Sequence, residues 1–208
     1  MAFSASASAL MAPAGATAHP RDALRQATAH LHAAVDVGMP LSRPAVTLAD
    51  YHQHLCLLRD WVQALRALPL PADRLDAEAA ALNLDVQTCE RLRGCDSPAR
   101  RAFPDEPAAH VAGDADALAW GVAYVIEGSR LGGQMLYRRL AEPLAPHPLH
   151  YLQGAGARTG AHWRAFLDGL RVALDTPARV QTACDGAVLA FEQLLRLSRL
   201  AGARGAAA

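Results

Sequence analysis

The pair His32 and Asp36 is the first feature of the sequence that could do chemistry. They stand four residues apart, so on a helix their side chains share one face. A histidine that binds a metal usually has its second ring nitrogen hydrogen-bonded, often to a carboxylate that fixes the tautomer and orients the ring. Arg25 lies about 10 Å along the same face, within reach of an anionic group on a ligand centred at His32. Taken alone, the pair is explained better as a helix-surface ion pair.

The glycines Gly128, Gly132 and Gly133 form a second unusual cluster, because they fall within an otherwise helical pattern. Each interior glycine costs a helix about 1 kcal/mol relative to alanine, so three within six residues need a reason. Gly128 and Gly132 are four residues apart and expose one strip of backbone. That strip either lets another helix approach closely or lets a flat ligand lie against the main chain. The spacing alone leaves both interpretations open.

Together, the two segments resemble the haem oxygenase family. The run Leu24-Arg-Gln-Ala-Thr-x-x-x-His32-x-x-x-Asp36 is similar to the family's proximal-helix motif, and Glu127-Gly-Ser-x-Leu-Gly-Gly-Gln134 is similar to its distal-helix motif. The form Tyr124-Val-Ile-Glu-Gly-Ser-Arg-Leu-Gly-Gly133 is most like the bacterial branch associated with bacteriophytochromes. The likeness extends in outline over about residues 21–200 and is specific only at these two motifs.

The resemblance implies a haem held between two helices. His32 would be the axial ligand of the haem iron, and Asp36 would orient its ring. Gly128 and Gly132 would be the distal glycines that let the second helix flex over the haem, with Gly133 beside them.

Further contacts are implied at both sides of the haem. Arg25 and Arg164 fall where the family places basic residues against the propionates, and Phe191 falls where an aromatic side chain packs against the macrocycle. Ser129 stands where several members carry a distal aspartate that organises water, and a hydroxyl holds water with less charge. Gln134 is a second polar group that could relay protons through ordered water.

The implied activity is stepwise oxidation of haem b, both substrate and cofactor, by O₂ and electrons to biliverdin, CO and Fe²⁺. No tightly bound flavin or nicotinamide is expected. A ferredoxin or a reductase would supply the electrons, and Arg138-Arg139 is either a docking patch for such an acidic donor or simple surface charge. A bacteriophytochrome is a candidate acceptor of biliverdin. A haem-binding carrier or sensor without turnover would carry the same binding residues, so that alternative stays open.

Two other enzyme classes find little support. Carboxylate-bridged di-iron proteins need Glu-x-x-His motifs on facing helices, and none of the six glutamates has histidine three positions on. A thiaminase-like hydrolase would need an active-site cysteine with acidic partners, and no local motif provides one.

The elements that must position these residues are predicted to be helices throughout. Apolar residues recur at three- and four-residue spacing over about residues 20–38, 50–68, 75–93, 114–140, 157–174 and 178–200, with no alternating strand pattern. We therefore expect an all-α, single-domain helical bundle over residues 20–200. Residues 1–19 and 201–208, rich in small residues, are expected to be disordered.

The amino-acid composition limits the classes of partner that the protein could bind. Every one of the 20 basic residues is arginine and the formal net charge is zero, which excludes lysine-based chemistry and gives no electrostatic signal for nucleic acid or an anionic membrane. No apolar run approaches the ~20 residues of a membrane span.

Four cysteines without metal-ligand spacing suggest reduced thiols in a cytoplasmic protein, although a Cys89–Cys95 disulfide stays open. We expect a monomer or weak dimer, and we expect His52 and His54 to lie on a solvated face.

Overall fold

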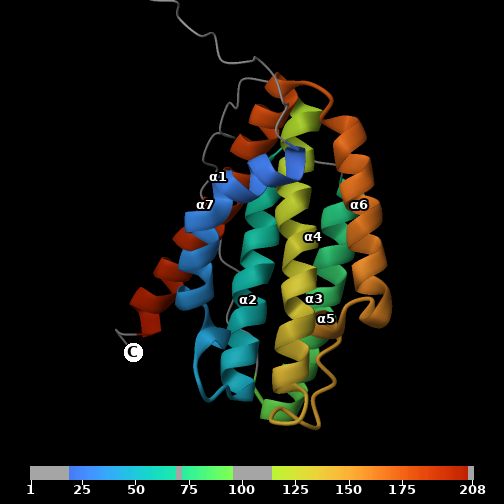
Figure 1. The fold of residues 1–208 in the computed structure, drawn as a ribbon. Helices are drawn as coiled ribbons and strands as arrows, with labels where there is room; N and C mark the ends of the chain where they lie inside the picture. Colours follow the sequence, from blue (N-terminus) through green and yellow to red (C-terminus); the bar gives the residue numbers. More distant parts are fainter. Residues whose placement is uncertain (1–18, 69–71, 96–113, 206–208) are drawn as a thin grey trace, which may run out of the picture.

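The computed structural model describes residues 19–68, 72–95 and 114–205, and within these ranges the chain contains helices and no strand. The all-α prediction is therefore confirmed, and Figure 1 shows the helices gathered into one bundle. The α-helices are α1 (Pro20–Gly38), α2 (Leu48–Leu65), α3 (Ala72–Arg93), α4 (Ala115–Leu140), α5 (His150–Gln153), α6 (Thr159–Ala173) and α7 (Pro177–Gly205). Two 3-10 turns, η1 (Pro40–Ser42) and η2 (Gly156–Arg158), precede α2 and α6.

Local signals in the sequence explain where the helices begin. Pro20 occupies the first turn of α1, where no backbone donor is needed. Thr47 and Asp50 form a reciprocal capping box at the start of α2, and Asp114 accepts hydrogen bonds from two backbone amides of α4. These caps satisfy backbone groups that a helix end leaves without partners.

The observed helix ends agree less well with the boundaries that the sequence predicted. Helix α7 continues to Gly205, five residues beyond the expected boundary at residue 200. The short helix α5 was not anticipated, because its four residues are too few to show a periodic pattern. The expected disorder of the N-terminal lead-in concerns residues 1–18, which lie outside the described residues.

The core lies around α7, which packs against α1, α2 and α4. Trp61 of α2 is almost fully buried and its indole N–H donates a 2.8 Å hydrogen bond to the Ala190 carbonyl of α7. His52 and His54 are also buried, at 5% and 7% exposure, so the prediction of a solvated face for them is wrong. Both lie on α2, which is covered on more than one side by α3 and α7.

Helices α4 and α7 cross at very close range. A Cβ added to Gly121 of α4 would lie 1.8 Å from the Ala183 carbonyl oxygen, and one added to Gly186 of α7 would lie 2.4 Å from the Leu118 carbonyl oxygen. Only glycine allows two helix backbones to approach this closely. This crossing fixes the upper half of α4 in the bundle.

Candidate functional site

His32 and Asp36 form the side of the site that lies on α1. The Nδ1 atom of His32 is 2.9 Å from Oδ2 of Asp36, and both side chains are 64% exposed. The His32 ring meets the Phe191 ring of α7 edge-on, with centroids 5.9 Å apart. Because Nδ1 is hydrogen-bonded to the carboxylate, Nε2 is the nitrogen left to bind a ligand. The resemblance implied that Phe191 packs against the macrocycle, and in the structure its ring contacts the His32 imidazole.

Gly128 and Gly132 form an uncovered strip on α4. A Cβ added at Gly132 would meet no neighbouring atom within 4 Å, and one at Gly128 would only touch the Trp163 ring at 4.0 Å. Leu131 and Met135, close to this strip, are among the exposed large apolar side chains of the protein, at 39% and 74% exposure. Among the described residues, only the Trp163 ring of α6 approaches Gly128 and nothing approaches Gly132, which leaves this backbone accessible to a ligand.

Tyr124 of the distal motif is influenced by charges on the helix that carries the proximal motif. It lies one helical turn before Gly128, and burial raises the pKa of its hydroxyl while the nearby positive charges of Arg21 and Arg25 oppose that rise. Both arginines lie in the first half of α1, on the N-terminal side of His32. The positive charges of Arg21 and Arg25 on α1 thus act on the Tyr124 hydroxyl of α4. Guanidinium groups and a phenol are donors suited to carboxylates.

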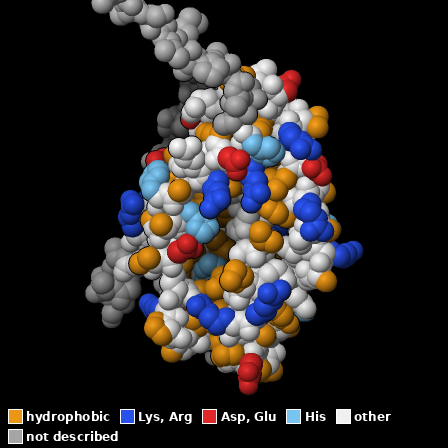
Figure 2. All heavy atoms as spheres, viewed as in Figure 1, with side chains coloured by type: hydrophobic (Ala, Val, Ile, Leu, Met, Phe, Trp, Pro, Cys, Tyr) orange, Lys and Arg blue, Asp and Glu red, His pale blue; other side chains and the backbone are white. Residues whose placement is uncertain are grey.

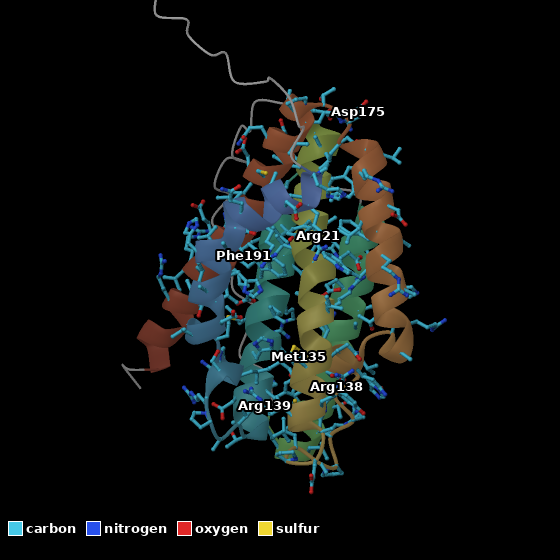
Figure 3. All side chains as sticks on the ribbon, in the orientation of Figure 1. Arg21, Met135, Arg138, Arg139, Asp175 and Phe191 are labelled. Atoms are coloured by element: carbon cyan, nitrogen blue, oxygen red, sulfur yellow. The ribbon has the colours of Figure 1, made fainter. Side chains whose placement is uncertain are left out.

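Below this point α1 turns away from α4 (Figure 1). Figure 2 shows a hollow in this face, with histidine and apolar side chains in and beside it and basic side chains above and below. In Figure 3, Arg21 and Phe191 lie above the centre of the hollow, and Met135, Arg138 and Arg139 lie toward its lower end. An Nη2 donor of Arg139 binds the Leu41 carbonyl and so ties α4 to η1, whereas Arg138 is exposed.

The remaining residues of the distal motif are used in different ways. Gly133 is buried and approaches the Leu152 backbone of α5, where an added Cβ would lie 3.4 Å from the carbonyl oxygen. The Gln134 amide donates to the carbonyls of Leu152 and Gln153. Both residues thus attach α4 to α5 and do not form part of the open strip. The exposed Ser129 donates a 2.7 Å hydrogen bond to the Ile126 carbonyl.

Arg164 is the predicted site residue that has the least structural support. It lies exposed on α6, and no ion pair or hydrogen bond is found for its side chain within the described part of the chain. Its neighbour Trp163 does reach the site, since its ring packs against Tyr124 at 5.6 Å between centroids and touches the Gly128 position. The sequence analysis treated Trp163 only as a core anchor.

Sequence reasoning also missed a buried polar cluster behind α4. Glu78 and Asp85 of α3 are 2% and 0% exposed, and their partners include Tyr151, Tyr51 and Arg130. A signal was present in the sequence. These two acidic residues fall on the same three- and four-residue spacing as the buried Leu75, Leu82 and Cys89, and a carboxylate on an apolar stripe requires buried partners.

The available donors fit haem better than a multidentate metal ion. Within residues 19–68, 72–95 and 114–205, no group of three or more histidine, cysteine, aspartate or glutamate side chains is placed to hold a metal. Cys89 and Cys95 are free thiols, so the disulfide left open by the sequence is not present. A single imidazole, an uncovered glycine strip and the positive charges of Arg21 and Arg25 instead match a flat, anionic ligand with one axial coordination position. No described helix is both long and apolar enough to cross a membrane.

Comparison with known proteins agrees with this geometry. The chain is 38% identical over 104 residues to a heme oxygenase of Xanthomonas campestris pv. campestris (strain 8004), an alignment that covers 49% of this chain and 59% of that protein. No family model matches the chain. The aligned part of this chain is therefore similar to part of a heme oxygenase, and it spans about three fifths of that protein's length.

Proposed function

We propose that this protein is a haem oxygenase that binds haem in the hollow between α1 and α4. The observation that carries the proposal is the uncovered strip at Gly128 and Gly132, on the helix whose Tyr124 is influenced by the charges of Arg21 and Arg25 of α1. Each of these glycines lowers the stability of the helix, and no described helix packs against them to explain their presence. A flat ligand against the backbone provides that explanation.

Each neighbouring side chain has a role in this proposal. The Nε2 atom of His32 coordinates the iron, and the hydrogen bond from its Nδ1 to Asp36 holds the neutral tautomer and the ring orientation. Phe191 restricts rotation of the imidazole through its edge contact. Arg21, Arg25 and Tyr124 bind the propionates.

Three further residues are assigned more distant roles. Ser129 offers a hydroxyl beside the strip to hold water, and Gln134 and Gly133 set the position of the distal helix through α5. Arg164 is proposed as an additional propionate contact that would need its side chain to swing from its exposed position on α6. Bound haem would supply the iron and the ring that O₂ and electrons convert to biliverdin, CO and Fe²⁺.

Titration of the purified chain with haemin tests the proposal first. We expect one-to-one binding with a shifted Soret band, and after reduction in air we expect loss of that band with growth of biliverdin absorbance. Ferredoxin with its reductase, or ascorbate, can supply the electrons. A Soret band that persists through reduction in air would leave the carrier or sensor as the function. Absence of haem binding would exclude both.

The axial ligand is tested with His32→Ala and the matched variant His30→Ala. His30 is also exposed on α1 but lies two positions from His32, which places it on another face of the helix. We expect His32→Ala to change the ferric, ferrous and CO-bound spectra while the helix content by circular dichroism stays the same. His30→Ala should keep the wild-type spectra. Identical spectra for both variants would show that the iron is held by another residue.

The branch associated with bacteriophytochromes is a further part of the proposal, and it rests on the motif around Tyr124 and Gly133. It assigns the biliverdin product to chromophore supply and the electrons to a ferredoxin or a reductase. Chromatography of the product of one turnover identifies the biliverdin isomer. Addition of a bacteriophytochrome apoprotein during turnover should then trap that product as a covalent holoprotein. Failure of the apoprotein to take up the product would favour iron acquisition.

A further inference from the structure

A cavity of about 260 Å³ lies between α3, α4, α5 and α6. It is separate from the open strip of α4, since neither Gly128 nor Gly132 lines it. A volume of this size has room for about eight water molecules or for one small organic ligand. Ala81, His150 and His162 line the cavity and are exposed. Solvent therefore reaches the cavity between α3, α5 and α6.

Thr159 supplies a buried hydroxyl group without a partner. The residue is 7% exposed, and its Oγ1 atom is buried and has no hydrogen-bond partner in the described part of the chain. This oxygen lies 4.0 Å from the place where a Cβ on Gly154 would be, and Gly154 also lines the cavity. Buried polar groups are nearly always paired, because an unpaired one costs the free energy of its desolvation. The hydroxyl therefore indicates that a polar group occupies the cavity.

Two carboxylates line the cavity, and both are paired with the same guanidinium group. Arg130 donates to Oε2 of Glu78 at 3.1 Å (Nε) and 2.8 Å (Nη2), and to Oε1 of Glu127 at 2.8 Å (Nη1). The three groups together therefore carry a surplus negative charge. The Glu78 side chain is 2% exposed and its Oε1 also accepts from the Tyr151 hydroxyl, whereas the Glu127 side chain is 21% exposed. Glu127 is thus the carboxylate that a ligand in the cavity can reach.

The charge and the apolar lining together define the class of ligand. The surplus negative charge attracts a cation and repels an anion. Helix α6 begins at Thr159, and the positive end of its dipole, equivalent to roughly half an elementary charge, offsets this surplus only in part. No group of three histidine, cysteine, aspartate or glutamate side chains among the described residues is placed to hold a metal ion, which favours an organic cation. Ala77, Ala155 and Trp163 also line the cavity and offer apolar surface to an alkyl group.

We propose that this cavity is a binding site for a small primary alkylammonium compound. Its ammonium group donates hydrogen bonds to the Glu127 carboxylate and to the Thr159 hydroxyl, and its alkyl chain lies against Trp163. This site does not depend on the proposed function, because none of these contacts involves haem. The Trp163 ring also touches the Gly128 position at 4.0 Å, so an occupant would lie one side chain away from the open strip.

The class of ligand is tested with propylammonium, 1-propanol and propionate, which are similar in length and differ in charge. Each is titrated calorimetrically into the full chain without haem at one ionic strength. We expect one-to-one binding of propylammonium, with the other two at least about tenfold weaker, because hydrogen bonds to charged groups contribute that much. Absence of propylammonium binding, or equal binding of all three probes, would overturn the proposal. Tightest binding of propionate would overturn it in favour of an anion site.

The binding residues are tested with Thr159→Val and Glu127→Gln. Each should weaken propylammonium binding at least about fivefold, since each removes one acceptor of a charge-assisted hydrogen bond. Thr182→Val and Glu192→Gln on α7 are the matched controls, because neither residue lines the cavity, and they should stay within about twofold of wild type. Affinities in Thr159→Val and Glu127→Gln that equal those of the controls would contradict the proposal.

Urea unfolding without the probe separates lost binding from lost structure. Because the Thr159 hydroxyl has no partner in the described part of the chain, Thr159→Val should keep or raise the midpoint of unfolding. Propylammonium should raise the midpoint of wild type and leave that of Thr159→Val unchanged. A lower midpoint in Thr159→Val without the probe would show that the hydroxyl already has a partner, which would remove the basis of the proposal.

The position of the bound probe is tested by nuclear magnetic resonance of the tryptophan indole N–H groups, with Trp163→Phe to assign the Trp163 signal. We expect propylammonium to shift the Trp163 signal in a saturable way. The Trp61 indole donates to the Ala190 carbonyl of α7 and does not line the cavity, so its signal should stay in place. Binding without a shift at Trp163 would place the probe elsewhere on the chain and overturn the assignment of this cavity.

The outcomes of these experiments are independent of those for haem. If haem binds and is degraded but propylammonium does not bind, only the cavity proposal fails. If propylammonium binds as expected in a chain that does not bind haem, the cavity proposal stands and the enzyme assignment fails.

Discussion

Two parts of helix α4 use glycine for opposite purposes. At Gly121 the backbone of α7 approaches so closely that a Cβ would lie 1.8 Å from the Ala183 carbonyl oxygen. At Gly132, eleven residues further along the same helix, a Cβ would meet nothing within 4 Å. Three helical turns advance the face by only about 20° over eleven residues, so both glycines lie on nearly one stripe. One end of this stripe is covered by a helix and the other is open.

The difference teaches how a bundle can keep a ligand face accessible. The crossing at Gly121 and Gly186 holds α4 firmly, and the contacts of Gly133 and Gln134 with α5 hold its lower half from behind. The strip between them is therefore rigidly supported without being covered. Substitutions on the covered end should act on stability, and those on the open end should act on ligand binding.

The largest expected effect follows from substitution at the covered end. Gly121→Ala forces the α4 and α7 backbones apart, and we expect a loss of about 3 kcal/mol or more in the free energy of unfolding, at the upper end of overpacking effects. Urea denaturation followed by circular dichroism measures it. Wild-type stability in this variant would show that the close crossing is not present in solution.

The buried histidine His54 of α2 should also contribute to the acid sensitivity of the fold. Burial lowers the pKa of His54 from its usual 6.5 to about 4, so the unfolded chain takes up a proton that the folded chain refuses. This contribution to stability is complete above pH 6.5 and is lost as the pH falls from 6.5 to 4, by roughly 3 kcal/mol in total.

His54→Gln tests this linkage, because glutamine does not titrate. Its free energy of unfolding should decline less steeply between pH 6.5 and 4 than that of wild type. The exposed His30→Gln serves as the control and should keep the wild-type slope. Equal slopes in His54→Gln and wild type would assign the acid sensitivity to other groups.

A bulky side chain at the open end should act on the ligand and spare the fold. Gly132→Leu places an apolar branch in the hollow, and we expect haem affinity to fall at least about tenfold, equivalent to ~1.4 kcal/mol. Haemin titration measures this change. Gly202→Leu on α7 also enters open space and is the matched control. Unchanged haem affinity in Gly132→Leu would show that haem does not lie against this strip.

The smallest expected effect is that of alanine on the free energy of unfolding, and its sign differs between the covered end and the open end of α4. Gly132→Ala meets no steric obstacle, so the better helix propensity of alanine should raise the free energy of unfolding by up to about 1 kcal/mol. The same substitution at Gly121 should lower it. Thermal or urea unfolding of both variants under one set of conditions gives the comparison. Destabilisation by Gly132→Ala would indicate that a neighbour covers this position.

Much of the fold and the local half of the site were predictable. The periodic pattern indicated the long helices, because amphipathic spacing depends only on nearby residues. The contact of His32 with Asp36 follows directly from four-residue spacing on a helix. The short helix α5 was missed because four residues show no periodic pattern. The burial of His52 and His54 was missed because it depends on the helices that cover α2.

The sequence by itself determined two helical motifs and the cost of the glycines in the second. It could not decide between a helix crossing and a ligand face for glycine on α4. Tertiary structure placed the crossing at Gly121 and left Gly128 and Gly132 uncovered, because the paths of α7 and α1 decide which turns of α4 receive a neighbour. Long-range packing likewise brought the charges of Arg21 and Arg25 to act on Tyr124 and enclosed Glu78, from helices that are far apart in the chain.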